Sequence, residues 1–148
     1  MSARTMPLPS LYEADEVAWL ETMAGLIQTG RAAELDLPHL QEYLTDMAKR
    51  DRKEVVSRLI VLLSHLLKWE YQPDKRSESW TSTIVTQQQE LLLEFETSTT
   101  LRNHAVAKLA DAYAKARSRA ARETKLPIET FPETFAGTLD DVLAAEAG

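Results

Sequence analysis

The stretch from Val55 to Trp80 constrains the fold most, because it combines the most apolar segment of the chain with a proline-containing corner. Its apolar side chains form two adjoining stripes at helical spacing. These are Val55, Leu59, Leu62, Leu66 and Trp69, and Val56, Ile60, Leu63 and Leu67. A helix that is apolar over most of its circumference must be buried by other elements. The pattern therefore predicts an all-α bundle with the Val55 to Trp69 helix at its centre.

Size and composition fit this prediction. The chain has 148 residues, 44% of them hydrophobic and 27% charged, as in soluble globular proteins. We expect one domain over residues 1–148 with one core and four to five main helices. The chain has no cysteine, which excludes disulfides, a thiolate nucleophile and cysteine-based metal sites. No signal peptide or membrane span is recognisable, so we expect a cytoplasmic protein.

The first half of the chain predicts two long helices. Residues 1–9 contain two prolines and are expected to be an extended tail. A helix is predicted from Leu11 to Thr29, ended by Gly30, whose backbone can adopt the left-handed conformation. A second helix is predicted from Leu37 to Tyr71, because no glycine or proline interrupts it between Pro38 and Pro73.

The second half predicts two further helices and an arm. Ser77 is a suitable N-cap for the helix after the corner, and another helix should follow the polar break at residues 98–100. Residues 126–148 contain irregularly spaced apolar residues around two prolines. They are expected to form an arm that packs on the bundle and ends in a short helix after Thr138.

Polar and aromatic side chains cluster at the corner and form the candidate ligand-binding residues. They are His65, Lys68, Trp69, Tyr71, Gln72, Arg76, Ser77 and Trp80. Cations and hydrogen-bond donors beside two indole rings could bind an anion or an aromatic ligand. The same aromatic residues could instead brace the corner, with Lys68 reaching solvent.

The net charge of −6 argues against general binding to nucleic acid or anionic lipid, but the charge is unevenly distributed. Residues 10–48 contain eight acidic residues and one arginine, whereas residues 49–58 are mainly basic. A candidate basic face follows the later helix and comprises Lys108, Lys115, Arg119 and Arg122. Such a face could bind phosphates, but no nucleic-acid recognition motif accompanies it. We favour the explanation that these charges are solvated or form intramolecular ion pairs, which is the common outcome for runs of charge.

Catalytic and metal-binding motifs are absent from the sequence. No Glu-x-x-His pair occurs, and glycine stands only at residues 25, 30, 137 and 148, so no phosphate-binding loop can be built. His39 could share a helix face with Glu42 and Asp46, which alone do not predict a metal site. We therefore predict no catalytic residues, no metal and no cofactor.

These observations favour a non-catalytic helical interaction or adaptor protein, which associates with a protein partner or with itself. The alternative is a small-ligand or enzymatic site at the corner between His65 and Trp80, and the third hypothesis is association with nucleic acid. No membrane association is expected.

Several motifs resemble one bacterial family. They are Tyr12 with Asp15 and Trp19, the run from His65 to Pro73, Arg76 to Trp80, Glu123 to Pro127, and Phe131 to Glu133. Together they resemble the domain-of-unknown-function family twenty-nine over about Tyr12 to Leu143. The chain has Met47 to Arg50 where the family tends to carry a glycine, and Phe135-Ala136 where a Cys-Pro pair is expected. The resemblance implies an all-helical bacterial cytoplasmic protein and supplies no activity, cofactor or catalytic residue.

Overall fold

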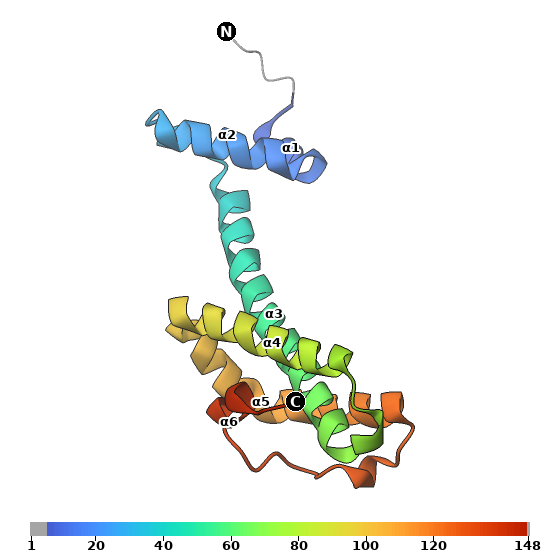
Figure 1. The fold of residues 1–148 in the computed structure, drawn as a ribbon. Coiled ribbons are helices and arrows are strands. Elements are labelled where there is room, and N and C mark those ends of the chain that lie inside the picture. Colours follow the sequence, from blue (N-terminus) through green and yellow to red (C-terminus); the bar gives the residue numbers. More distant parts are fainter. Residues whose placement is uncertain (1–5, 148) are drawn as a thin grey trace. The chain divides into compact units, whose positions relative to one another are not determined.

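The computed structural model describes residues 6–147 and contains helices but no strands within that range (Figure 1). The α-helices are α1 (Leu8–Ala14), α2 (Glu16–Gln28), α3 (Leu37–Tyr71), α4 (Glu78–Thr97), α5 (Thr99–Thr124) and α6 (Leu139–Ala144). Three short 3₁₀ helices are η1 (Ala32–Glu34), η2 (Pro73–Lys75) and η3 (Ile128–Thr130). The all-α prediction is confirmed.

The chain divides into two compact units, Met1–Lys49 and Arg50–Gly148, called here the N-terminal and C-terminal units. Their buried side chains form two hydrophobic clusters, where the sequence predicted one core. The helix α3 spans 35 residues and contributes to both clusters, with Leu40 and Tyr43 in the first and Val55 to Leu67 in the second. Its bounds agree with the prediction, because its only proline occupies the first turn, where no helical hydrogen bond is lost.

The cluster of the N-terminal unit is small. Its buried members are Leu8, Trp19, Met23 and Leu26, and the Trp19 side chain is fully enclosed. Partly buried side chains from α1, α2 and α3 surround them. This unit therefore depends on very few enclosed apolar groups.

Two predictions for the start of the chain were wrong. Leu8 and Pro9 belong to α1 instead of an extended tail, since proline is compatible with the first helical turn. The rest of that predicted tail, up to residue 5, lies outside the described residues. The predicted helix from Leu11 to Thr29 is interrupted at Asp15, whose extended backbone (φ −153°) separates α1 from α2. The Asp15 carboxylate accepts a hydrogen bond from the Ala18 amide at 3.1 Å and caps α2.

The C-terminal unit surrounds the apolar part of α3. Buried side chains of α3 pack with those of α4, α5 and α6 in one cluster, which includes Ile84, Leu91, Ala112 and Phe131. Ser77 and Ser98 cap α4 and α5 by accepting hydrogen bonds from backbone amides three residues later.

The C-terminal arm is fastened to this unit by its backbone as well as its apolar side chains. The Tyr113 hydroxyl donates to the Pro132 carbonyl at 2.6 Å, and Arg117 Nε donates to the Phe131 carbonyl at 3.1 Å. The Gln88 amide donates to the carbonyls of Val142 and Ala145. These bonds fix the arm beside α4 and α5.

Candidate functional site

The corner between α3 and α4 is braced by Arg76. Pro73 follows the end of α3, and the Ser77 hydroxyl accepts a hydrogen bond from the Trp80 amide at 3.2 Å, which starts α4. Arg76 Nε donates to the Trp69 carbonyl at 2.8 Å, and its guanidinium lies 4.7 Å from the centre of the Trp69 ring. The carbonyl at the end of α3 is thereby satisfied by a side chain. Arg76 thus holds the turn closed.

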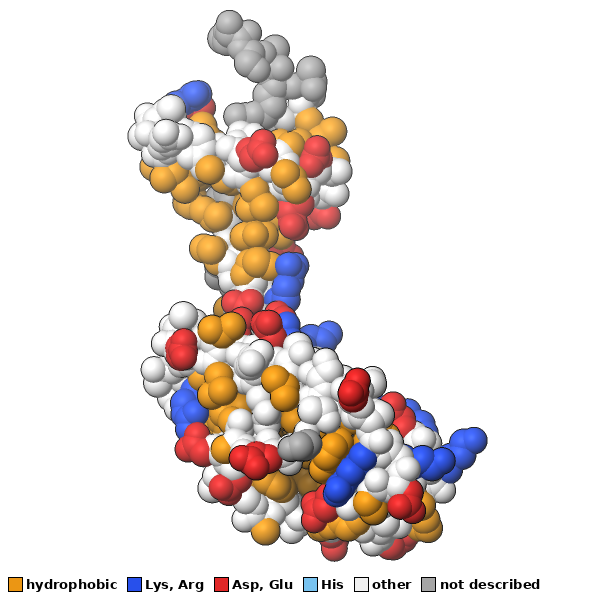
Figure 2. All heavy atoms as spheres, in the orientation of Figure 1, with side chains coloured by type: hydrophobic (Ala, Val, Ile, Leu, Met, Phe, Trp, Pro, Cys, Tyr) orange, Lys and Arg blue, Asp and Glu red, His pale blue; other side chains and the backbone are white. Residues whose placement is uncertain are grey.

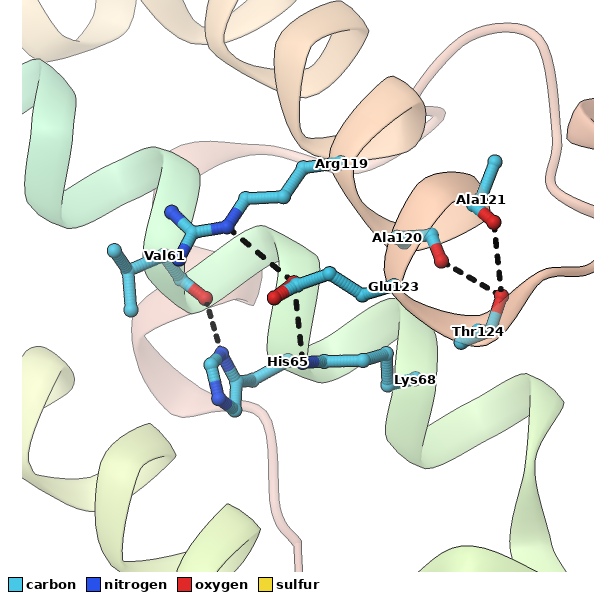
Figure 3. Close-up of polar contacts among 8 residues, drawn as sticks. All are labelled: Val61, His65, Lys68, Arg119, Ala120, Ala121, Glu123 and Thr124. Atoms are coloured by element: carbon cyan, nitrogen blue, oxygen red, sulfur yellow. Dashed lines mark hydrogen bonds and ion pairs between the residues drawn. The ribbon is translucent and has the colours of Figure 1, made fainter.

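Lys68 belongs to a buried polar cluster and does not reach solvent. Its residue surface is only 7% exposed, and its ammonium lies 3.3 Å from Glu123 Oε1 (Figure 3). Arg119 Nε contacts the same oxygen at 3.3 Å. The ammonium also lies 5.6 Å from the centre of the Trp80 ring. Glu123 therefore neutralises the cation that the sequence offered as a ligand-binding group.

The charges in this cluster affect the acidity of its members. Burial raises the pKa of the Glu123 carboxyl, but Lys68 and Arg119 outweigh burial and hold that pKa below its usual value. Burial lowers the pKa of His65, and the neighbouring cations Lys68 and Arg119 lower it further. The Val61 carbonyl and Glu123 raise this pKa, but by less. His65 is therefore neutral at neutral pH, and its Nδ1 lies 2.8 Å from the Val61 carbonyl one turn earlier (Figure 3).

The other predicted corner residues do not converge on one cavity. The Tyr71 ring packs edge-on against Phe131 of the arm, with ring centres 5.4 Å apart. Gln72 is half-buried. The structure therefore forms two separate pairs from the predicted set, Lys68 with Trp80 and Arg76 with Trp69.

A pocket of about 490 Å³ adjoins the corner and includes two of the predicted residues, Trp69 and Arg76. Its remaining lining residues come from α3, the arm and α6, and they are Leu66, Glu70, Phe135, Gly137, Asp141, Val142, Ala145 and Glu146. His65, Lys68 and Trp80 are not among them. The sequence could not place this pocket, because six of its ten lining residues belong to the arm and α6, more than 50 residues further along the chain.

The predicted basic face lies on α5, where Lys108, Lys115, Arg119 and Arg122 are all exposed. Arg119 is engaged with Glu123, whereas the other three cations make no ion pair with any residue between 6 and 147. Residues 49–58 are also mainly basic, and one of their cations is engaged within the chain. Arg58 bonds to Glu54 at 3.0 Å and to Gln87 at 3.1 Å.

Sequence reasoning missed a second polar cluster, in the N-terminal unit. Asp36 is buried and accepts hydrogen bonds from Trp19 Nε1 at 3.1 Å and from the His39 ring at 2.8 Å. The His39 ring stacks on Tyr12 with ring centres 4.3 Å apart. Burial raises the pKa of Asp36, but the bonds to His39 and Trp19 hold it below its usual value. Nothing local in the sequence indicated that Asp36 would have a partner 17 residues away.

Within the described part of the chain, no group of three or more His, Cys, Asp or Glu side chains is arranged to hold a metal ion. No helix there is long and apolar enough to cross a membrane. Both polar clusters are internally paired, and each ties one helix to another segment of the chain.

These features define a protein that is all-helical over residues 6–147, in which the buried Asp36 and Lys68 side chains bind partners from other segments of the chain. The chain belongs to the family described as Domain of unknown function DUF29, which matches residues 11–147. The family resemblance predicted from the sequence motifs is thus confirmed. No curated protein and no solved structure matches the chain.

Proposed function

We propose that this protein is a non-catalytic helical interaction protein, which binds another protein through apolar side chains of its N-terminal unit. The observation that carries the proposal is the exposure of four large apolar side chains on two helices. Val17 and Ile27 of α2 are 64% and 58% exposed, and Leu37 and Leu44 of α3 are both 61% exposed. Figure 2 shows hydrophobic side chains gathered over α2 and the first turns of α3.

Exposed apolar groups are significant here because the unit that bears them has so small a core. A unit of this size buries too little apolar surface to be strongly stable alone, so covering more of that surface stabilises it. Contiguous apolar patches on soluble proteins commonly mark interaction sites. We call the exposed side chains of Val17, Ile27, Leu37 and Leu44 the apolar face.

The polar clusters support a non-catalytic role. Lys68 and Glu123 satisfy each other, as do Asp36 and His39, so these titratable groups already serve the fold. A general acid or base must be within reach of a substrate proton, whereas these side chains face partners in their own chain. A cytoplasmic location, expected because the sequence shows no recognisable signal peptide or membrane span, stays a prediction.

The proposal is tested by replacing Leu44 with Ser in the full chain, produced with an affinity tag in the cells that normally make it. Leu93→Ser is the matched control, because Leu93 is 58% exposed but belongs to the C-terminal unit. Both substitutions should change the free energy of unfolding by less than about 0.5 kcal/mol, since the side chains are exposed. Mass spectrometry should then find a protein that co-purifies with the wild type and with Leu93→Ser but not with Leu44→Ser. Identical sets of co-purifying proteins would contradict the proposal.

A second candidate is a small-ligand site in the pocket beside the corner. The observation that favours it is the presence of Trp69 and Arg76 in the wall of a pocket of about 490 Å³, a usual size for ligand pockets. A ligand that binds there should raise the melting temperature of the wild type but not of Arg76→Ala. A screen of carboxylates, phosphates and nucleotides in which no compound shifts the wild type would argue against this candidate.

A further inference from the structure

The exposed apolar positions of the N-terminal unit lie at helical spacing and are distinct from the positions that form its core. On α2, Val17, Ala24 and Ile27 are exposed, whereas Trp19, Met23 and Leu26 are buried. The helix is therefore apolar on two sides, and only one side is used by the unit itself. A second helix packed along the exposed side would find apolar contacts on successive turns.

The first turns of α3 repeat this arrangement. Leu37 and Leu44 are seven residues apart and lie on the same side of the helix, while Tyr43 and Leu40 pack on the core. Ala48 continues the exposed line one turn later. Two neighbouring helices of one small unit thus both present an unused apolar line.

The charge of the same unit limits what can cover this face. Between residues 6 and 49 it has eight carboxylates and two cationic side chains, Arg31 and Lys49. Arg31 is paired with Glu34, so it does not offset the other acidic groups. Several exposed carboxylates make no ion pair with a residue that the structure describes, and they are Glu16, Glu21, Glu42 and Asp46.

Two of these carboxylates lie on α2 beside its exposed apolar residues. Glu21 follows Val17 by one helical turn, and Glu16 lies three turns before Ile27 on the same side of the helix. A second copy of the chain would bring a further set of carboxylates against this surface. Like charges placed together across an interface cost several kcal/mol, whereas opposite charges speed and orient association.

Resting on the proposed function, we propose that the partner contributes a cationic amphipathic helix, whose apolar side covers the apolar face and whose Lys or Arg side chains meet the carboxylates. The apolar contacts supply affinity, and the charges select the partner and its orientation. A neutral apolar helix is not attracted by the carboxylates, and an acidic helix is repelled by them.

The proposal can be tested with the full chain and a designed probe. The probe is a labelled amphipathic peptide of about 18 residues, five helical turns, with Leu on one side and Lys on the other. Its control has Glu in place of every Lys. Fluorescence anisotropy gives the dissociation constant, at ionic strengths from about 0.05 M to about 0.5 M, where screening becomes strong.

We expect the Lys peptide to bind and the Glu peptide not to bind. Leu44→Ser and Glu21→Lys should each weaken binding of the Lys peptide by about tenfold or more, as expected for central positions of an interface. The matched controls, Leu93→Ser and Glu129→Lys, change exposed residues of the C-terminal unit and should weaken binding by less than about twofold. Circular dichroism verifies that each variant is folded.

Three results would overturn the proposal. Equal binding of both peptides would mean that charge does not select the partner. Equal weakening by Leu93→Ser and Leu44→Ser would mean that the peptide binds without a specific site. A dimer that Leu44→Ser dissociates and that the Lys peptide does not disturb would mean that a second copy covers the apolar face. If the Lys peptide fails to bind but Leu44→Ser still loses a partner in cells, the proposed function stands and only the cationic helix is wrong.

Discussion

Replacing Glu123 with Gln should destabilise the C-terminal unit more than replacing Lys68 with Met, although both changes remove the same ion pair. The reason is the unequal burial of the two side chains. The Lys68 side chain is 9% exposed and the Glu123 side chain 40% exposed. Gln at position 123 keeps an oxygen that can accept a hydrogen bond from the ammonium but removes the negative charge that balances it, which leaves a buried cation without a counter-charge. Met at position 68 leaves a carboxylate that still contacts Arg119 and water.

The expected sizes follow from the geometry. Charges 3.3 Å apart attract by about 5 kcal/mol at an effective dielectric constant near 20, and loss of hydration of the ammonium offsets much of this. Removing one partner of a fully buried pair costs about 3 to 5 kcal/mol. Because Glu123 is partly solvated, we expect Glu123→Gln to cost about 2 kcal/mol. Lys68→Met keeps the volume of the side chain and should cost less than about 1 kcal/mol.

Urea denaturation followed by tryptophan fluorescence measures the difference. The substitution Trp19→Phe, made in every protein compared, leaves Trp69 and Trp80 of the C-terminal unit as the reporters. A double-mutant cycle over Lys68 and Glu123 then separates the pair from its surroundings. If Lys68→Met costs as much as Glu123→Gln or more, the buried ammonium is not the source of the effect and the reasoning fails.

Three further predictions concern the same unit. Leu63→Ala should lower the free energy of unfolding by about 2 to 5 kcal/mol, because Leu63 is 2% exposed and its removal leaves a cavity, whereas exposed Leu93→Ala should stay within about 0.5 kcal/mol. The pKa of His65 is lower in the folded protein than its ordinary 6.5, so the unfolded chain binds more protons and stability falls as the pH drops below about 6.5. In urea titrations at several pH values, His65→Gln should therefore lose less stability than the wild type as the pH falls. Identical pH profiles of the two proteins would mean that His65 does not cause the loss. Truncation after Lys125 should lower the melting temperature and increase binding of an apolar-surface dye, and an unchanged melting curve would mean that the arm does not close the core.

Helix positions were predictable where local chemistry determines them. The bounds of α3 follow from its uninterrupted apolar and charged pattern between Asp36 and Pro73, and the serine caps follow from hydroxyls placed before helical runs. Asp15 shows the limit of this reasoning. Its carboxylate is a good cap, but the apolar spacing on either side also fits one continuous helix. Which alternative is realised depends on packing between α1 and α2.

The polar clusters were not predictable for a related reason. Glu123 lies 55 residues from Lys68, and Asp36 lies 17 residues from Trp19, so neither pairing is encoded in a local spacing. Of the candidate corner residues, only Trp69 and Arg76 line the pocket beside the corner, and Lys68 contacts Glu123 instead of solvent. Val17 and Ile27 are exposed on α2, whereas the unit encloses Met23 and Leu26 of the same helix. A helix that is apolar on two sides does not reveal in its own sequence which side the fold will use.

The late position of the arm matters while the chain is being synthesised. Phe131, Leu139 and Val142 belong to the same buried cluster as the apolar part of α3, so this cluster cannot close until they have emerged. About 95 residues separate Lys49 from Leu143, which at typical translation rates corresponds to roughly 5 to 20 s. The N-terminal unit can fold during this time, while the most apolar helix of the nascent chain stays uncovered and available to chaperones.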